Sequence, residues 1–149
     1  MPLYTQKKGE KPRLIYRWIH HPEFQFKDLL QVMIGASILA IPVGFTEETW
    51  ELGATLPFLN VLILFAITVL FIAAFVYYHY YAEHGLEKHF WEFIKRTFST
   101  YIASFVVVAV LLTIIQRTPW TTDFILALKR VIIVTFPSSM SAVVADILK

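Results

Sequence analysis

Residues 29–53 read LLQVMIGASILAIPVGFTEETWELG, an apolar stretch that ends in a group of three carboxylates. The part before Thr46 carries no charged side chain. About 20 apolar residues are enough for a helix to cross the ~30 Å of hydrocarbon in a bilayer. The stretch therefore predicts a first membrane-spanning helix over Leu29–Gly53, with Glu47, Glu48 and Glu51 near its end.

The composition of the whole chain agrees with a membrane protein. Of its 149 residues, 57% are hydrophobic and 16% are aromatic, whereas soluble domains have an apolar content of roughly 45–50%. Charged side chains lie between the apolar runs, as expected when an uncovered charge in hydrocarbon costs at least ~2.5 kcal/mol. The chain has no cysteine, which excludes disulfides, thiolate metal sites and cysteine nucleophiles.

Three more apolar runs follow, and each predicts another span. The second is expected over Leu56–Tyr78, next to a group of aromatic residues that suits the headgroup level. The third is expected over Thr97–Gln116, in one helical unit with the amphipathic segment Leu86–Phe98 before it. The fourth is expected over Val131–Leu148, interrupted at Pro137.

These spans define the predicted architecture. We expect an all-α, homo-oligomeric protein with a four-helix transmembrane domain in residues 29–149, preceded by a basic cytoplasmic tail, residues 1–28. Lys129 and Arg130 would lie at headgroup depth, where long basic side chains reach water. They could also bind lipid phosphate, or pair with Asp123 or with the carboxylates that follow the first span. No second domain is expected.

The distribution of basic residues predicts the orientation of the spans. Of the 13 Lys and Arg residues, ten lie in the tail, the connector between the second and third spans, and the C-terminal position, and three lie on the other side. The positive-inside tendency then puts both termini in the cytoplasm. We expect a multi-pass protein of the cell membrane whose three clustered glutamates face outward.

One stripe of the first helix suggests a pore. At about 100° per residue, these side chains fall near one meridian: Leu30, Ile34, Ser37, Ile41, Gly44 and Glu48. A carboxylate ring at the mouth and a narrow apolar stretch below it are features of cation channels. The alternative, which the sequence leaves open, is that the stripe packs helix on helix and the glutamates form a solvated helix end.

The glutamates favour an oligomer that binds cations. Three carboxylates within five residues repel one another, and a symmetric assembly turns each into a ring. Many oxygen ligands are what a hard cation such as Ca²⁺ requires. Glu48 would be the main metal ligand, with Glu47 or Glu51 as an outer vestibule. The ring does not by itself choose among Ca²⁺, Mg²⁺, Na⁺ and K⁺.

Residues 46–50 have the pattern Thr-x-Glu-x-Trp. This pattern resembles the selectivity-filter signature of the voltage-gated calcium and sodium channel superfamily. The resemblance implies that Glu48 is the filter carboxylate, that Thr46 lines the filter and that Trp50 braces it. It covers five residues, and the chain departs from that family because it has no arginine-rich voltage sensor and no separate pore loop. It therefore implies a similar site and not a related fold.

Two broader resemblances concern the layout. Four spans, cytoplasmic termini and a glutamate at the outer end of the first span resemble the Orai type of store-operated calcium channel. As a whole, the chain resembles small integral-membrane protein families of prokaryotes, which implies no particular function. The leading hypothesis is a homo-oligomeric cation channel, with Ca²⁺ as the favoured ion and further copies of the chain and membrane lipids as partners.

Two other functions fit the sequence. The first is a small ion-coupled transporter that uses the fourth span broken at Pro137, with Ser139 and Asp146 as functional residues and Lys149 or the tail as the partner of Asp146. The second is a non-conducting accessory membrane protein that docks a partner through its amphipathic connector. No catalytic motif is present, so an enzyme is not expected. The basic tail is too small to indicate nucleic-acid binding.

Overall fold

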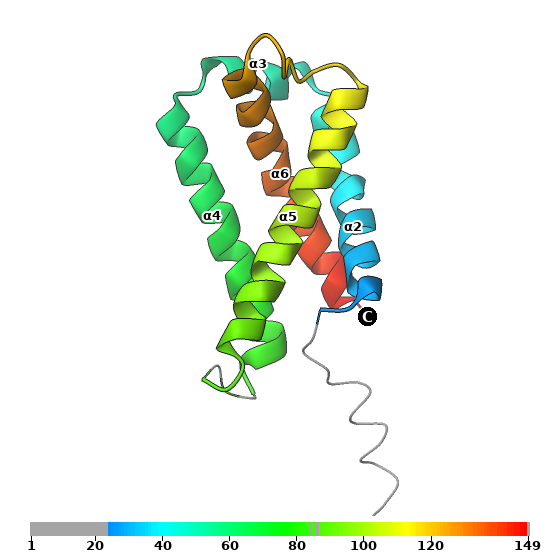
Figure 1. Ribbon diagram of the computed structural model, residues 1–149, viewed down its shortest axis with the longest axis vertical. Helices are drawn as coiled ribbons and strands as arrows, with labels where there is room; N and C mark the ends of the chain where they lie inside the picture. The colour runs from blue at the N-terminus through cyan, green and yellow to red at the C-terminus, as the bar shows by residue number, and fades with distance from the viewer. Residues whose placement is uncertain (1–23, 84, 86, 149) are drawn as a thin grey trace, which may run out of the picture.

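The computed structural model describes residues 24–83, 85 and 87–148, and Figure 1 shows them as a bundle of long helices. Its elements, in chain order, are α2 (Phe26–Gly44), α3 (Glu47–Thr55), α4 (Phe58–Val76), the π-helix η1 (Tyr77–Tyr81), α5 (Phe90–Ile114) and α6 (Phe124–Ile147). The described residues contain no β-strand. Most of the predicted tail, residues 1–23, lies outside the described part of the chain.

Four segments are long and apolar enough to cross a membrane: α2, α4 together with η1, α5, and α6. This confirms the prediction of an all-α fold with four candidate transmembrane helices. The third span begins at Phe90, so the amphipathic connector is continuous with it from that residue on, as predicted.

The central helix is α6. It packs against α2, α3, α4 and α5, and it is the most buried of the four spans, whereas α4 is the least buried. In Figure 1, α4 and α2 lie on opposite sides of the bundle with α5 and α6 between them. Close approach on several sides favours small side chains, and α6 buries Ala127, Ser138, Ser139 and Ala142.

The two ends of the bundle are built differently. The short helix α3 lies at one end, uppermost in Figure 1, which we call the α3 end. At the other end α2 and α5 begin, and η1 and α6 terminate. We call this the Asp146 end, after the buried aspartate in the last turn of α6.

The helices α2 and α6 approach closely at Gly35. A Cβ atom on Gly35 would lie only 2.9 Å from the Cα of Ala142 and from the carbonyl oxygen of Ser141. Ala36 and Ala40 are buried on the same helix. Small residues at such a contact let two backbones pack directly, which brings α2 against the central helix.

The predicted continuous helix over Leu29–Gly53 is wrong, because α2 ends at Gly44 and α3 starts at Glu47. The last-turn carbonyl groups of a helix lack partners within the helix, and here side chains from α3 and the turn before it supply them. The hydroxyls of Thr46 and Thr49 donate to the Val43 carbonyl at 2.9 and 3.0 Å. Trp50 Nε1 donates to the Gly44 carbonyl at 2.8 Å. These bonds stabilise the break between the helices.

The predicted pore stripe is consequently divided. Glu48 lies on α3 and not on the helix that carries the rest of the stripe. Gly44 is buried and faces Leu112, whose Cδ2 would lie 3.3 Å from an added Cβ. The large apolar members, Leu30, Ile34 and Ile41, are exposed on the surface of α2. The half-buried Ser37 donates its hydroxyl to the Met33 carbonyl.

The fourth span also differs from its prediction. It starts at Phe124, before the expected boundary at Val131, and continues as an α-helix through Pro137 without a break. Hydroxyls around the proline bond to backbone carbonyls of the same helix. Ser138 donates to Val134 at 2.8 Å and Ser139 donates to Phe136 at 2.9 Å. Such bonds help a helix tolerate proline in a membrane.

The close contact of α2 on α6 can be tested with Gly35→Ala. The added methyl group has no space against the backbone of α6, and overpacking of this kind costs about 1–3 kcal/mol. We expect a lower midpoint of thermal unfolding in detergent. Ala74→Val, which adds carbon on an exposed position of α4, is the matched control and should change the midpoint little. An equal loss in both variants would contradict this packing.

Candidate functional site

Charged side chains from several helices meet inside the bundle at the Asp146 end. Arg96 on α5 is 1% exposed, Asp146 on α6 is 3% exposed and Asp28 on α2 is 5% exposed. Desolvation of such ions costs several kcal/mol each unless they are paired. Ionisable residues inside a membrane bundle are therefore candidates for function.

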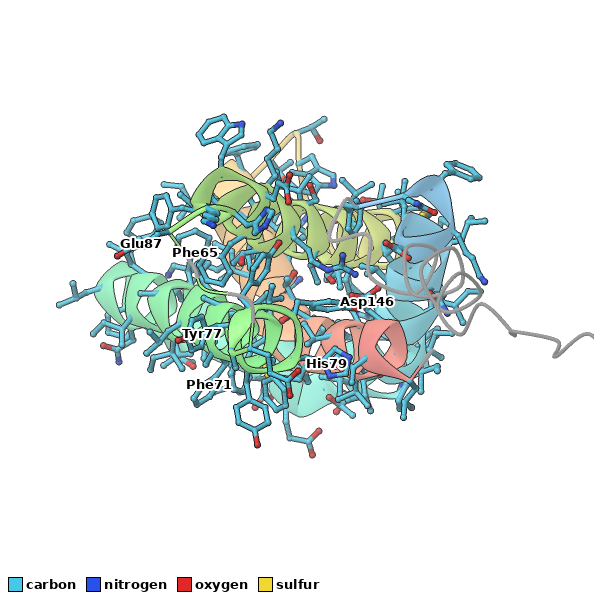
Figure 2. All side chains as sticks on the ribbon, turned by 90° about the horizontal axis from the view of Figure 1, so that it is seen from below. Phe65, Phe71, Tyr77, His79, Glu87 and Asp146 are labelled. Atoms are coloured by element: carbon cyan, nitrogen blue, oxygen red, sulfur yellow. The ribbon has the colours of Figure 1, made fainter. Side chains whose placement is uncertain are left out.

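The contacts among these side chains centre on one oxygen atom. Arg96 Nη2 donates to Asp146 Oδ2 at 2.7 Å, and the Tyr80 hydroxyl donates to the same oxygen at 3.2 Å. Arg96 Nη2 also donates to the Tyr80 hydroxyl at 2.9 Å and lies 3.5 Å from Asp28 Oδ2. Figure 2 looks onto this end and shows Asp146 lying between the helices. We call Asp28, Tyr80, Arg96 and Asp146 the Arg96 cluster.

The π-helix η1 brings Tyr80 to the cluster. Tyr77 and Tyr78 are exposed, as expected of aromatic rings at a membrane boundary, but Tyr80 is half-buried and Tyr81 is buried. The Arg96 guanidinium carbon lies 3.9 Å from the centroid of the Tyr80 ring. Single π-turns occur often at functional sites. Each of the four spans thus contributes one side chain to the cluster.

Buried hydroxyl groups follow Arg96 along α5, and others lie on α6. They belong to Thr97, Thr100, Ser104, Thr135, Ser138 and Ser139. Most of them donate to a carbonyl about one turn earlier, as Ser104 does to Thr100 at 2.9 Å. Within the described part of the chain, Thr97 Oγ1 and the Tyr101 hydroxyl have no hydrogen-bond partner. Buried polar atoms of this kind are places where a polar ligand or a water molecule can bind.

Sequence reasoning found one member of the cluster and missed three. It singled out Asp146 but expected Lys149 or the tail as its partner; Lys149 and residues 1–23 lie outside the described residues, and the partner that the structure shows is Arg96. Asp28 was assigned to the tail, although it lies in the first turn of α2 and accepts from the Gln25 N–H at 3.2 Å. One signal for Arg96 was available, because Thr100 and Ser104 follow it at helical spacing on α5.

The predicted cation filter lies at the opposite end. Glu48 is exposed on α3, while Thr46 and Trp50 bond to the end of α2 as described above. Within the residues described here, no group of three or more His, Asp or Glu side chains is arranged to hold a metal ion. A ring of Glu48 from several copies therefore stays a prediction.

The basic residues at the start of α6 bond to the backbone and not to the predicted carboxylates. Lys129 Nζ donates to the Leu56 carbonyl at 2.8 Å. Arg130 donates to the carbonyls of Trp50 and Arg117. Asp123 instead caps α6, since its Oδ1 accepts from the Leu126 N–H at 3.0 Å. These bonds hold the α3 end together.

Comparison with known proteins gives the family of the chain. The model of the DUF2391 family of integral membrane proteins matches residues 5–148, so the chain belongs to this family. No curated protein and no solved structure matches it. The match confirms an integral membrane protein, and the resemblances to the two kinds of channel stay predictions.

Removal of the Asp146 carboxylate should destabilise the bundle strongly. Asp146→Ala takes away the acceptor at 2.7 Å from the Arg96 guanidinium, and the loss of one partner of a buried pair costs about 3–5 kcal/mol. Glu92→Gln is the control, because its pair with His89 is partly exposed and worth ~1 kcal/mol or less. Both variants are compared with the wild type by their free energies of unfolding in detergent. Similar small losses of this free energy in the two variants would contradict the buried pair.

Proposed function

We propose that this member of the DUF2391 family is an ion-coupled membrane transporter in which the Asp146 carboxylate exchanges the Arg96 guanidinium for a transported cation or proton. The observation that carries the proposal is the Arg96–Asp146 contact, buried where all four spans meet. Charged groups in the interior of a membrane bundle are expensive and commonly mark ion pathways.

The exchange follows from the chemistry of the carboxylate. Arg96 is an internal counter-ion, since a guanidinium stays protonated under all ordinary conditions. A proton or metal cation that binds Asp146 reduces the attraction for Arg96, because the carboxylate charge is then neutralised. Tyr80 donates to the same carboxylate oxygen, so its hydroxyl must also turn or break its bond when the oxygen is occupied.

The neighbouring hydroxyls provide oxygen ligands for such an ion. A hydroxyl that donates its hydrogen to a helix carbonyl keeps its lone pairs as acceptors. Thr100 and Ser104 are arranged in this way along α5. The hydroxyls of Thr97 and Tyr101, which have no partner among the described residues, can accept and donate. A cation or a hydrated proton moving inward from Asp146 therefore meets polar atoms.

Release of Arg96 would also change the structure of this end. The cluster joins α2, η1, α5 and α6, so loss of the central contact weakens several helix contacts at once. The other end keeps its bonds among α2, α3 and α6. Opening at the Asp146 end alone is one half of an alternating-access cycle.

The test is coupled flux in liposomes that contain the purified protein and a pH-sensitive dye. Gradients of Na⁺, K⁺ or Ca²⁺ imposed across the membrane should drive a change in internal pH through the wild type. Asp146→Asn should abolish this change, because the amide can neither bind a proton nor balance Arg96. Glu92→Gln should transport at the wild-type rate.

A second variant separates function from folding. Tyr80→Phe removes one hydroxyl but keeps both charges, so the protein should fold and yet show an altered rate. Elution as a single species from a gel-filtration column verifies the fold of each variant. Full coupled flux through folded Asp146→Asn, or no coupled flux through the folded wild type under any of the three gradients, would exclude the proposal.

The cation channel is a second candidate, favoured by the surface near α3 and α2. Glu48 is exposed and makes no ion pair with any described residue. The apolar side chains of Leu30, Ile34 and Ile41 are exposed on α2, where copies of the chain could pack around a shared path. Under this hypothesis a ring of Glu48 side chains from several copies of the chain selects the cation, with Ca²⁺ as the favoured ion.

Glu48→Gln distinguishes the two candidates. A channel conducts down a gradient without proton exchange, and Glu48→Gln should then lower Ca²⁺ flux by at least about tenfold, as expected for loss of a charge-assisted contact. The transporter predicts unchanged coupled flux in Glu48→Gln. Both are measured in the same liposomes, with Asp146→Asn as the reciprocal variant.

A further inference from the structure

A pocket of mixed charge lies at the α3 end, far from the Arg96 cluster. Its volume is about 260 Å³, and it is lined by Glu47, Trp50, Glu51, Ala54, Arg117 and Arg130. These residues come from α3, from the turn between α5 and α6, and from α6. The channel hypothesis uses Glu47, Trp50 and Glu51 of this lining, but neither function considered above uses Arg117 and Arg130.

The two arginines are held in place by contacts with the chain. The Arg117 guanidinium carbon lies 3.7 Å from the centroid of the Trp50 ring, a cation–π contact. Arg130 Nε donates to the Trp50 carbonyl at 3.3 Å, and its Nη1 donates to the Arg117 carbonyl at 2.6 Å. A Cβ atom on Gly53 would collide with the Arg130 side chain, so the glycine leaves room for the arginine along α3. Two positive charges are thus held beside one pocket.

The glutamates give the same pocket a negative side. Glu47 and Glu51 line it, yet among the described residues neither forms an ion pair with Arg117 or Arg130. Opposite charges that share a pocket without pairing can each bind a group of a ligand. The pocket therefore suits a molecule with an anionic and a cationic group close together.

The position in the membrane favours a lipid headgroup as this ligand. With 24 residues, α6 is about 36 Å long at 1.5 Å per residue, which exceeds the ~30 Å of hydrocarbon. Arg130 lies about 9 Å from the start of α6, and from this depth its long side chain can reach back to the headgroups. Trp residues also gather at the headgroup level. Exposed apolar side chains of Leu52, Phe58 and Phe124 lie nearby in the chain and can contact acyl chains.

We propose that this pocket binds the headgroup of a phosphatidylethanolamine-type lipid. The phosphate contacts Arg117 and Arg130, whose N–H groups suit a phosphate, and the ammonium contacts Glu47 and Glu51. A phosphatidylglycerol headgroup has the phosphate but no ammonium. A phosphatidylcholine headgroup has a quaternary ammonium that cannot donate hydrogen bonds to the carboxylates.

The experiment measures binding of short-chain lipids to the delipidated protein in detergent by native mass spectrometry. Phosphatidylethanolamine should bind at least about tenfold more tightly than phosphatidylglycerol or phosphatidylcholine, the factor expected for one charge-assisted contact. Glycerophosphoethanolamine, which has the same headgroup without acyl chains, should bind more weakly than the lipid.

Substitutions test the positive and the negative side of the pocket separately. Arg117→Gln should weaken binding of phosphatidylethanolamine and phosphatidylglycerol alike. The double variant Glu47→Gln with Glu51→Gln should lose the preference for phosphatidylethanolamine while it still binds phosphatidylglycerol. Glu48→Gln removes the same charge from α3 at a position outside the pocket lining, so it is the matched control and should bind as the wild type does. Arg117 lies outside the helices, so its variant should leave the bundle folded.

Three results would overturn the proposal. The first is equal binding of the three lipids to the wild type. The second is a loss of preference in Glu48→Gln as large as that in the double glutamate variant. The third is binding of glycerophosphoethanolamine as tightly as the lipid, which would assign the pocket to a soluble ligand. Coupled ion flux does not enter these measurements, so they are independent of the proposed transport.

Discussion

The ion pair between Arg96 and Asp146 is the constraint on which the arrangement of the helices depends. A charge so deeply buried must be paired or it destabilises the fold, and the side chains that surround this pair come from every span. Their helices must therefore converge at one end. At the other end no such requirement exists, and a short helix with backbone contacts covers the bundle.

The difference between the two ends also separates two kinds of chemistry. In the Arg96 cluster the opposite charges touch, so a ligand must displace one of them. In the pocket beside α3 the opposite charges lie apart, so a ligand can fill the space between them. Competition between a cation and Arg96 for the Asp146 carboxylate suits transport, because the ion is released when Arg96 returns. Binding between separate charges suits a ligand that stays bound. The two proposals thus differ through the spacing of the same few residue types.

Hydropathy predicted the four spans because membrane crossing depends on length and apolarity, which are local properties of the sequence. Hydropathy did not predict features that depend on a side chain bonding to a residue elsewhere in the chain. The break after Gly44 depends on Trp50 reaching back to a carbonyl group, and no periodic pattern records that bond. Asp28 and Arg96 lie at predicted span boundaries, where charge is commonly attributed to headgroups. Their burial depends on the contact between them and on the pairing of Arg96 with Asp146 of α6, which only the folded chain shows. The filter resemblance rested on Thr46, Glu48 and Trp50, and in the structure Thr46 and Trp50 bond to the last carbonyl groups of α2.

The separation of Arg96 from Asp146 along the chain bears on biosynthesis. Asp146 is made 50 residues after Arg96, so α5 enters the membrane before its acceptor on α6 exists. Until then Asp28 and Tyr80, which are made earlier, are the members of the cluster that the guanidinium can contact. The first three spans still lack the central helix against which they pack, so arrival of the last span is expected to complete the bundle late in synthesis.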